Sequence, residues 1–227
     1  MNWRDSQESV RRRLNECYDK EGVQRYESWI AQLGDSDDQA CLADLAPEFQ
    51  FTSAMRVLDA GAGTGAMCRT ILSAGVTELI ALEPCASMIE VLRGKPELSS
   101  IVVEKGFCDS TADRGLFPQS RFDVIVSRQL VNGLYDPFAA FHNWSHWLRS
   151  EGYVVVIDGI YDRDAWRDVM DVDHLPLGAC RTMATVPYLL EASGFDIVTV
   201  KWMAATNELP LTRTPRYVVI ARKGVQQ

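Results

Sequence analysis

The sequence predicts an α/β protein with a seven-stranded, mostly parallel, doubly wound sheet whose last strand is antiparallel. Five short apolar runs alternate with helical stretches, the pattern of a parallel sheet covered on both faces. The strands are expected at 56–60, 78–82, 100–104, 122–127 and 153–158, and the helices at about 64–74, 85–93 and 136–149. Two more strand candidates, 195–203 and 216–221, have no helix predicted between them, so we expect them to pair antiparallel.

The first 50 residues differ in texture from the rest. They are polar and helical in character, and Tyr18, Tyr26 and Trp29 are spaced so that they share one helical face. Residues 34–38 read as a loop and 40–49 as a short further helix. We therefore expect a helical lid over 1–50, followed by a core over 51–227 with a substrate-cap insertion at about 161–182.

Composition excludes several classes of protein. The chain has 227 residues, with 23 basic and 31 acidic side chains and a formal net charge of -8, which disfavours binding to nucleic acid. No apolar run reaches the length of a membrane span, and the first residues carry no signal-peptide pattern. The six cysteines are widely spaced and fit free buried thiols. These features predict a cytoplasmic protein that does not bind membranes.

A metal site is not expected. His142 and His146 are four residues apart on a predicted helix, which is a spacing that metal ligands use. The sequence places no carboxylate at a fitting third position, so we predict no metal.

A glycine loop between the first strand and the first core helix carries the main functional signal. Gly61, Gly63 and Gly65 stand at alternate positions after Asp59, and a helix is expected to begin near Thr64. Glycines let a backbone turn tightly and approach a ligand closely, and a helix start offers free N–H groups. The spacing differs from that of dinucleotide-binding loops.

Three acidic residues stand at or just beyond the ends of successive predicted strands. Asp59 would repel a pyrophosphate but suits a cofactor that carries an ammonium and a sulfonium group. Glu83 can accept hydrogen bonds from both ribose hydroxyls, and Asp109 from an adenine amino group. The carboxyl ends of the strands are where open α/β sheets bind ligands.

With these residues, the chain resembles the class I S-adenosylmethionine-dependent methyltransferases over about residues 55–160. The resemblance implies that S-adenosylmethionine is the cofactor and S-adenosylhomocysteine the product. It places the methionine part on Asp59 and the glycine loop and the ribose on Glu83. It places the adenine near Pro84 and Met88, with Asp109 and Ser110 at its edge. The implied cofactor residues are Asp59, Gly61, Ala62, Gly63, Thr64, Gly65, Glu83, Pro84, Met88, Asp109, Ser110, Ser127 and Arg128.

The resemblance is closest to members that act on small molecules. Members that methylate bases of nucleic acids carry an Asn or Asp before Pro-Pro-aromatic after the fourth strand, whereas this chain has Ser-Arg-Gln-Leu over 127–130. We therefore expect methyl transfer to O, N or C of a small aromatic or apolar metabolite. A non-catalytic regulator that binds S-adenosylmethionine or S-adenosylhomocysteine is the alternative, and either protein would be a monomer or homodimer.

Candidates for contact with the methyl acceptor are ranked by location. Gln129 follows the fourth strand and Tyr161 the fifth, while His174 in the insertion is a candidate general base. Tyr18 and Tyr26 are candidates for closing the pocket from the lid. The competing interpretation of His174 is a surface or structural role. The competing interpretation of Tyr18 and Tyr26 is that they simply pack.

Overall fold

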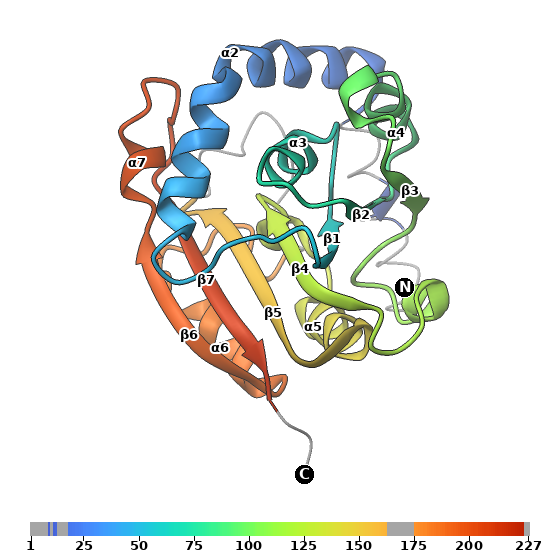
Figure 1. The fold of residues 1–227 in the computed structure, drawn as a ribbon, viewed down its shortest axis with the longest axis vertical. Coiled ribbons are helices and arrows are strands. Elements are labelled where there is room, and N and C mark those ends of the chain that lie inside the picture. The colour runs from blue at the N-terminus through green and yellow to red at the C-terminus, as the bar shows by residue number, and fades with distance from the viewer. Residues whose placement is uncertain (1–8, 10, 13–17, 163–174, 225–227) are drawn as a thin grey trace.

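The computed structural model describes residues 9, 11–12, 18–162 and 175–224. Their centre is one seven-stranded sheet in the order β3-β2-β1-β4-β5-β7-β6, shown in Figure 1. Its strands are β1 (Arg56–Ala60), β2 (Glu78–Glu83), β3 (Val102–Lys105), β4 (Phe122–Arg128), β5 (Leu148–Gly159), β6 (Phe195–Trp202) and β7 (Arg216–Lys223). The first five strands pair in parallel, and β7 runs antiparallel to both β5 and β6. The predicted fold class is confirmed.

Helices cover both faces of the sheet and create two apolar cores. The helices are α2 (Lys20–Leu45), α3 (Ala66–Ser73), α4 (Ala86–Arg93), α5 (Pro137–Trp147), α6 (Thr185–Ala192) and α7 (Ala204–Asn207), with short 3-10 turns at Pro96–Leu98, Ala112–Leu116 and Val131–Gly133. One core holds residues of α2, α3 and α4, and the other holds residues of α5 and α6. In β1, Val57 faces the first core and Leu58 the second, as strand alternation requires.

The N-terminal helical region differs from the prediction. The chain is interrupted at Gly34, as predicted, and two helical parts of α2 meet there; residues 35–38, however, are helical, and the second part ends at Leu45 rather than at 49. Gly34 bends this helix with a φ of 58° and ψ of -161°, a conformation that favours glycine. Asp37 and Asp38, which made the segment read as a loop, are buried in the structure.

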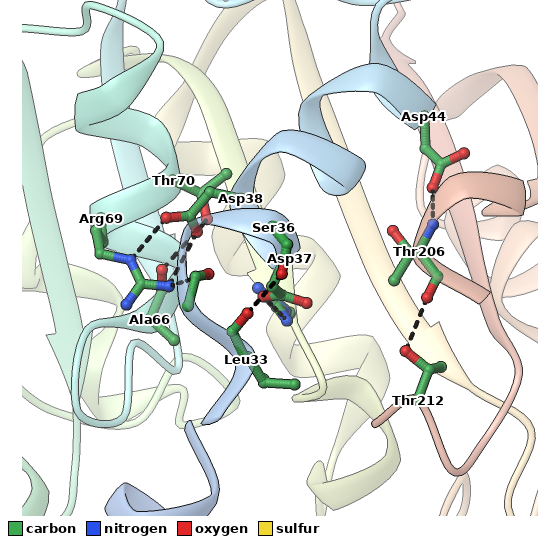
Figure 2. A network of polar contacts seen from close by, with 12 residues as sticks. Leu33, Ser36, Asp37, Asp38, Asp44, Ala66, Arg69, Thr70, Thr206 and Thr212 are labelled. Atoms are coloured by element: carbon green, nitrogen blue, oxygen red, sulfur yellow. Dashed lines mark hydrogen bonds and ion pairs between the residues drawn. The ribbon is translucent and has the colours of Figure 1, made fainter. Parts of the chain in front are cut away.

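Three buried aspartates fasten the second half of α2 to the rest of the protein, and the first of them, Asp37, pairs with Arg128 of β4. Asp38 accepts from Arg69 Nε at 2.7 Å and from the Thr70 hydroxyl at 2.5 Å, both on α3 (Figure 2). Asp44 accepts from the backbone N–H groups of Ala205 and Thr206 at the start of α7, at 3.0 and 2.8 Å. Because a buried carboxylate is costly without partners, these contacts hold α2 in one position.

The C-terminal segment also departs from the prediction. The one-turn helix α7 separates β6 from β7, so the expectation that no helix lies between them is wrong. The fifth strand begins at Leu148, five residues before its predicted start at 153, and pairs there with Phe122 of β4. Apolar periodicity did not reveal that start because residues 149–151 are exposed.

The division into a lid over 1–50 and a core over 51–227 remains a prediction, as does the substrate cap at about 161–182. The structure shows α2 joined to the end of β4 and to α3 and α7. Within the described residues, no helix has the length and apolar character needed to span a membrane.

Replacing Asp38 tests whether its buried contacts stabilise the fold. Asp38→Ala removes an ion pair and leaves Arg69 and Thr70 without their partner, so we expect a loss of about 1–3 kcal/mol in the free energy of unfolding. Asp35→Ala, on an exposed position of the same helix, should change it by less than about 0.5 kcal/mol. Urea unfolding measures both, and equal effects would contradict the assignment.

Candidate active site

A cavity of about 220 Å³ opens at the carboxyl ends of the parallel strands. Its walls come from the strand ends, from the loops that follow them and from the N-terminal region. They comprise Arg11, Tyr18, Tyr26, Gly61, Gly63, Leu82, Glu83, Pro84, Cys85, Met88, Gly106, Phe107, Cys108, Asp109, Arg128, Gln129, Leu130, Asn132, Gly133, Leu134, Tyr161 and Leu175. The cavity lies where α/β sheets of this kind bind ligands.

The glycine loop forms one wall. Gly61, Gly63 and Gly65 have φ angles of 71°, 55° and 91°, a region in which other residues are strained. The N–H groups of Gly61 and Ala62 donate to Leu82 O at 2.8 and 3.1 Å, which fastens the loop to the end of β2. A Cβ on Gly63 would meet no atom within 4 Å, so a side chain there would enter the cavity.

Glu83 joins the glycine loop to the start of α4. One carboxylate oxygen accepts from Gly63 N at 2.9 Å and the other from Cys85 N at 2.8 Å. Burial raises the pKa of this carboxyl, and the two backbone N–H groups oppose that rise. A carboxylate has about four acceptor positions, so each oxygen retains one toward the cavity.

Asp59 lies beneath the loop and does not line the cavity. Its side chain is 1 % exposed, and the Cys68 thiol donates to one of its oxygens at 3.1 Å. The other oxygen has no hydrogen-bond partner among the described residues. Burial raises the pKa of Asp59 to about 7, with a further contribution from the Glu83 carboxylate, while Cys68 and Arg128 act in the opposite direction.

Asp109 organises the opposite wall of the cavity. One carboxylate oxygen accepts from the N–H groups of Tyr135 and Asp136, at 2.9 and 3.2 Å, and the other from Arg11 at 3.2 Å. The Arg11 guanidinium also lies over the Phe107 ring, 4.9 Å from its centroid. Asp109 thus holds three segments together and keeps about one acceptor position for an adenine amino group.

Aromatic side chains from the N-terminal region cover the cavity. Tyr18 and Tyr26 meet edge to face with ring centroids 6.4 Å apart, and pack with Val23, Cys85 and Met88. Burial raises the pKa of Tyr26 well above its ordinary value, which removes it as a general base near neutral pH.

The predicted site residues divide into three groups. Those on the cavity wall are Tyr18, Tyr26, Gly61, Gly63, Glu83, Pro84, Met88, Asp109, Arg128, Gln129 and Tyr161. Those behind the wall are Asp59, Ala62, Thr64, Gly65, Ser110 and Ser127. His174 lies outside the described residues. The assignment of these residues to cofactor and acceptor remains a prediction.

Sequence reasoning missed several residues that shape the site. Arg11 holds Asp109, and Asp37 holds Arg128 at 2.6 Å with both side chains nearly buried. The partners lie 98 residues apart in the first pair and 91 in the second, so no local sequence pattern predicts these contacts. Arg216, at the start of β7, contacts Tyr161.

Comparison with known proteins identifies the family. The profile of a family described as "Methyltransferase domain" matches residues 36–200, most of the chain. The chain belongs to the class I S-adenosylmethionine-dependent methyltransferases. A search of curated proteins finds no match.

Solved structures of this methyltransferase fold agree in architecture. A "S-adenosylmethionine dependent methyltransferase from Mesorhizobium loti" is 23% identical with a TM-score of 0.61, over 81% of this chain and 98% of that one. An S-adenosylmethionine-dependent methyltransferase from Aquifex aeolicus is 16% identical with a TM-score of 0.65, over 90% and 98%. The "[4+2]-Cyclase SpnF" is 14% identical with a TM-score of 0.62, over 84% and 81%. The last similarity illustrates that this fold does not dictate one reaction.

The residues present fit the cofactor of the family, S-adenosylmethionine, whose sulfonium supplies an already activated methyl group. Glu83 keeps acceptor positions for a ribose diol, and Gly63 leaves the space that a side chain would fill. The unpartnered oxygen of Asp59 provides negative charge beneath the loop for an ammonium group. Met88 and Pro84 supply an apolar surface for the adenine ring.

Removing the Glu83 carboxylate should weaken cofactor binding. Glu83→Ala loses the acceptor for the ribose and also the anchor of Gly63, so we expect the affinity for S-adenosylhomocysteine to fall by about 1.5–3 kcal/mol. Glu90→Ala, on the exposed face of α4, serves as the matched control. Calorimetric titration measures both, and an unchanged affinity of Glu83→Ala would remove the residue from the ribose site.

Cofactor affinity should depend on pH through Asp59. Its pKa of about 7 means that the carboxyl is neutral at lower pH and gains, as pH rises through 7, the charge that attracts an ammonium group. Affinity for S-adenosylhomocysteine should therefore rise between about pH 5.5 and 7.5, by at most about tenfold per unit, and then level off. Asp59→Asn should bind more weakly with a flatter profile. An affinity that falls with pH, or a slope that persists in Asp59→Asn, contradicts this role.

Proposed function

We propose that this methyltransferase transfers a methyl group to O, N or C of a small organic acceptor that is mainly aromatic or apolar. The observation that carries the proposal is the mixed lining of the cavity, which combines a few polar groups with apolar side chains. Glu83, Gly61 and Gly63 lie on the wall of the same cavity as Leu130, Leu134 and Leu175. A mainly apolar pocket with a few placed polar groups suits a small organic ligand.

We place the acceptor beside Gln129 and Tyr161, in the part of the cavity that we call the acceptor end. Their side chains lie 3.0 Å apart and both line the cavity, so they can orient an acceptor by hydrogen bonds. The Val131–Gly133 turn that follows closes the wall beside them. The reaction is a displacement at carbon, for which positioning and exclusion of water supply much of the rate.

Proton removal is required only for acceptors that are not already ionised. Tyr18 and Tyr26 cover the cavity and exclude water, and the raised pKa of Tyr26 fits that role better than proton transfer. Tyr161 is the cavity-lining hydroxyl at the acceptor end. His174 remains a candidate base from the sequence.

A nucleic acid is not the acceptor that these features favour. The net charge of -8 opposes a phosphate backbone, and the chain lacks the Pro-Pro-aromatic segment of base-methylating members. The partner that we propose is a small molecule, encountered in the cytoplasm by a monomer or homodimer. No observation favours the alternative of a non-catalytic regulator.

Transfer of labelled methyl tests the proposal. The protein is incubated with methyl-labelled S-adenosylmethionine and a cell extract, which is then separated into small molecules, protein and nucleic acid. We expect label among the small molecules. This label should be absent when Glu83→Ala replaces the wild type, at a cofactor concentration below the raised dissociation constant of the variant. Label confined to macromolecules contradicts the proposed acceptor. Cofactor binding without any transfer supports the regulator instead.

A further inference from the structure

A buried guanidinium stands directly behind the acceptor end of the cavity. Arg216, the first residue of β7, is 8 % exposed, and its Nη1 donates to the Tyr161 hydroxyl. The amide orientation of Gln129 that satisfies all its neighbours places Oε1 2.6 Å from Arg216 Nη2 and 3.0 Å from Nη1. Gln129 and Tyr161 line the cavity, and both contact this cation, which does not itself line it.

The other two arginines at the cavity are neutralised by carboxylates, and Arg216 is not. Arg11 pairs with Asp109 at 3.2 Å and Arg128 with Asp37 at 2.6 Å. In the described part of the chain, no carboxylate lies within 4.0 Å of the Arg216 guanidinium. A buried cation without an ion-pair partner is costly, so an anionic ligand at this end of the cavity would offset the cost of burying Arg216.

Asp158 is the carboxylate whose field reaches Arg216, but its hydrogen bonds go elsewhere. Its oxygens accept from the N–H groups of Gly159 at 2.7 Å and Asn132 at 3.3 Å. Burial raises the pKa of Asp158 to about 6, with the guanidinium acting in the opposite direction. Asp158 thus accepts hydrogen bonds from the backbone at the end of β5 and in the turn after β4, and it forms no ion pair with Arg216.

Two features hold the guanidinium in place. Gly159 on β5 makes room for it, because a Cβ there would lie 2.7 Å from Nη1. Asn207 fixes the backbone of Arg216 from both sides: its Oδ1 accepts from Arg216 N at 2.6 Å and its Nδ2 donates to Arg216 O at 2.9 Å. The position of the charge is therefore built by three separate elements: β5, α7 and β7.

We propose that Arg216, with Gln129 and Tyr161, selects acceptors that carry an anionic oxygen, a carboxylate or an ionised hydroxyl, on an aromatic or apolar skeleton. The inference rests on the proposed function and adds the charge of the substrate. An anionic oxygen compensates the guanidinium, whereas a neutral amide of the same shape does not. Leu130, Leu134 and Leu175 contact the skeleton.

Matched pairs of acids and amides test this selection. Phenylacetate, 3-phenylpropionate and salicylate are titrated against the protein saturated with S-adenosylhomocysteine, each beside its primary amide, and binding is followed by ligand-observed NMR. We expect at least one acid to bind about tenfold or more tightly than its amide. Arg216→Gln should abolish that preference, and Arg216→Lys should keep part of it. Arg222→Gln, near the opposite end of β7 and with a partly exposed side chain, should keep all of it.

The outcomes separate this inference from the function on which it rests. A wild-type protein that does not bind S-adenosylhomocysteine contradicts the proposed function itself. The inference alone is overturned if the protein binds S-adenosylhomocysteine but prefers no acid over its amide. It is also overturned if the preference survives in Arg216→Gln. If Arg216→Gln does not bind S-adenosylhomocysteine, Gly159→Ala decides, because its Cβ would lie 2.7 Å from Arg216 Nη1 and 3.1 Å from Tyr161 Cε2 and so displaces the guanidinium and the Tyr161 ring together while the charge is retained. Loss of the preference there supports the inference, and its retention contradicts it.

Discussion

The ion pair between Arg128 and Asp37 is the contact on which the geometry of the site depends. It joins the end of β4 to the middle of α2, and its two side chains are 12% and 3% exposed. A buried pair of this kind is costly to break, since either charge alone would remain desolvated. The next residue, Gln129, has a φ of 55°, and its N–H donates to Ile157 O of β5 at 2.8 Å. Two consecutive residues thus face different partners, one holding the helix over the cavity and the other forming the acceptor wall.

Carboxylates organise the remaining walls through backbone N–H groups. Glu83 holds the glycine loop, Asp109 holds the segment before α5, and Asp158 holds the turn after β4. Each of these groups is buried, so each must be hydrogen-bonded, and the loops that supply the N–H groups become rigid as a result. The same burial that fixes the loops raises the pKa values of Asp59 and Asp158 toward neutrality. The same buried carboxylates therefore stabilise the fold and shape the binding site.

Features with a local pattern could be predicted from the sequence. The alternation of apolar runs and helices gave the strands of the sheet, and the glycine spacing with Asp59 and Glu83 located the loop that lines the cavity. Contacts between distant segments left no such pattern. The acidic run that includes Asp37 and Asp38 was interpreted as a loop because charged residues are usually exposed, whereas here both aspartates are buried and each pairs with an arginine on another element. Arg216 was overlooked because a single arginine at the start of a strand carries no sign of what it will contact.

A crystal structure with S-adenosylhomocysteine tests the central claim, that this cavity holds the cofactor with its sulfur toward the acceptor wall. The account predicts ribose hydroxyls on the Glu83 carboxylate, the homocysteine part along the glycine loop and the sulfur facing the Gln129 and Tyr161 side of the cavity. A ligand bound elsewhere contradicts the account. So does one whose ribose avoids Glu83 or whose sulfur points away from that wall.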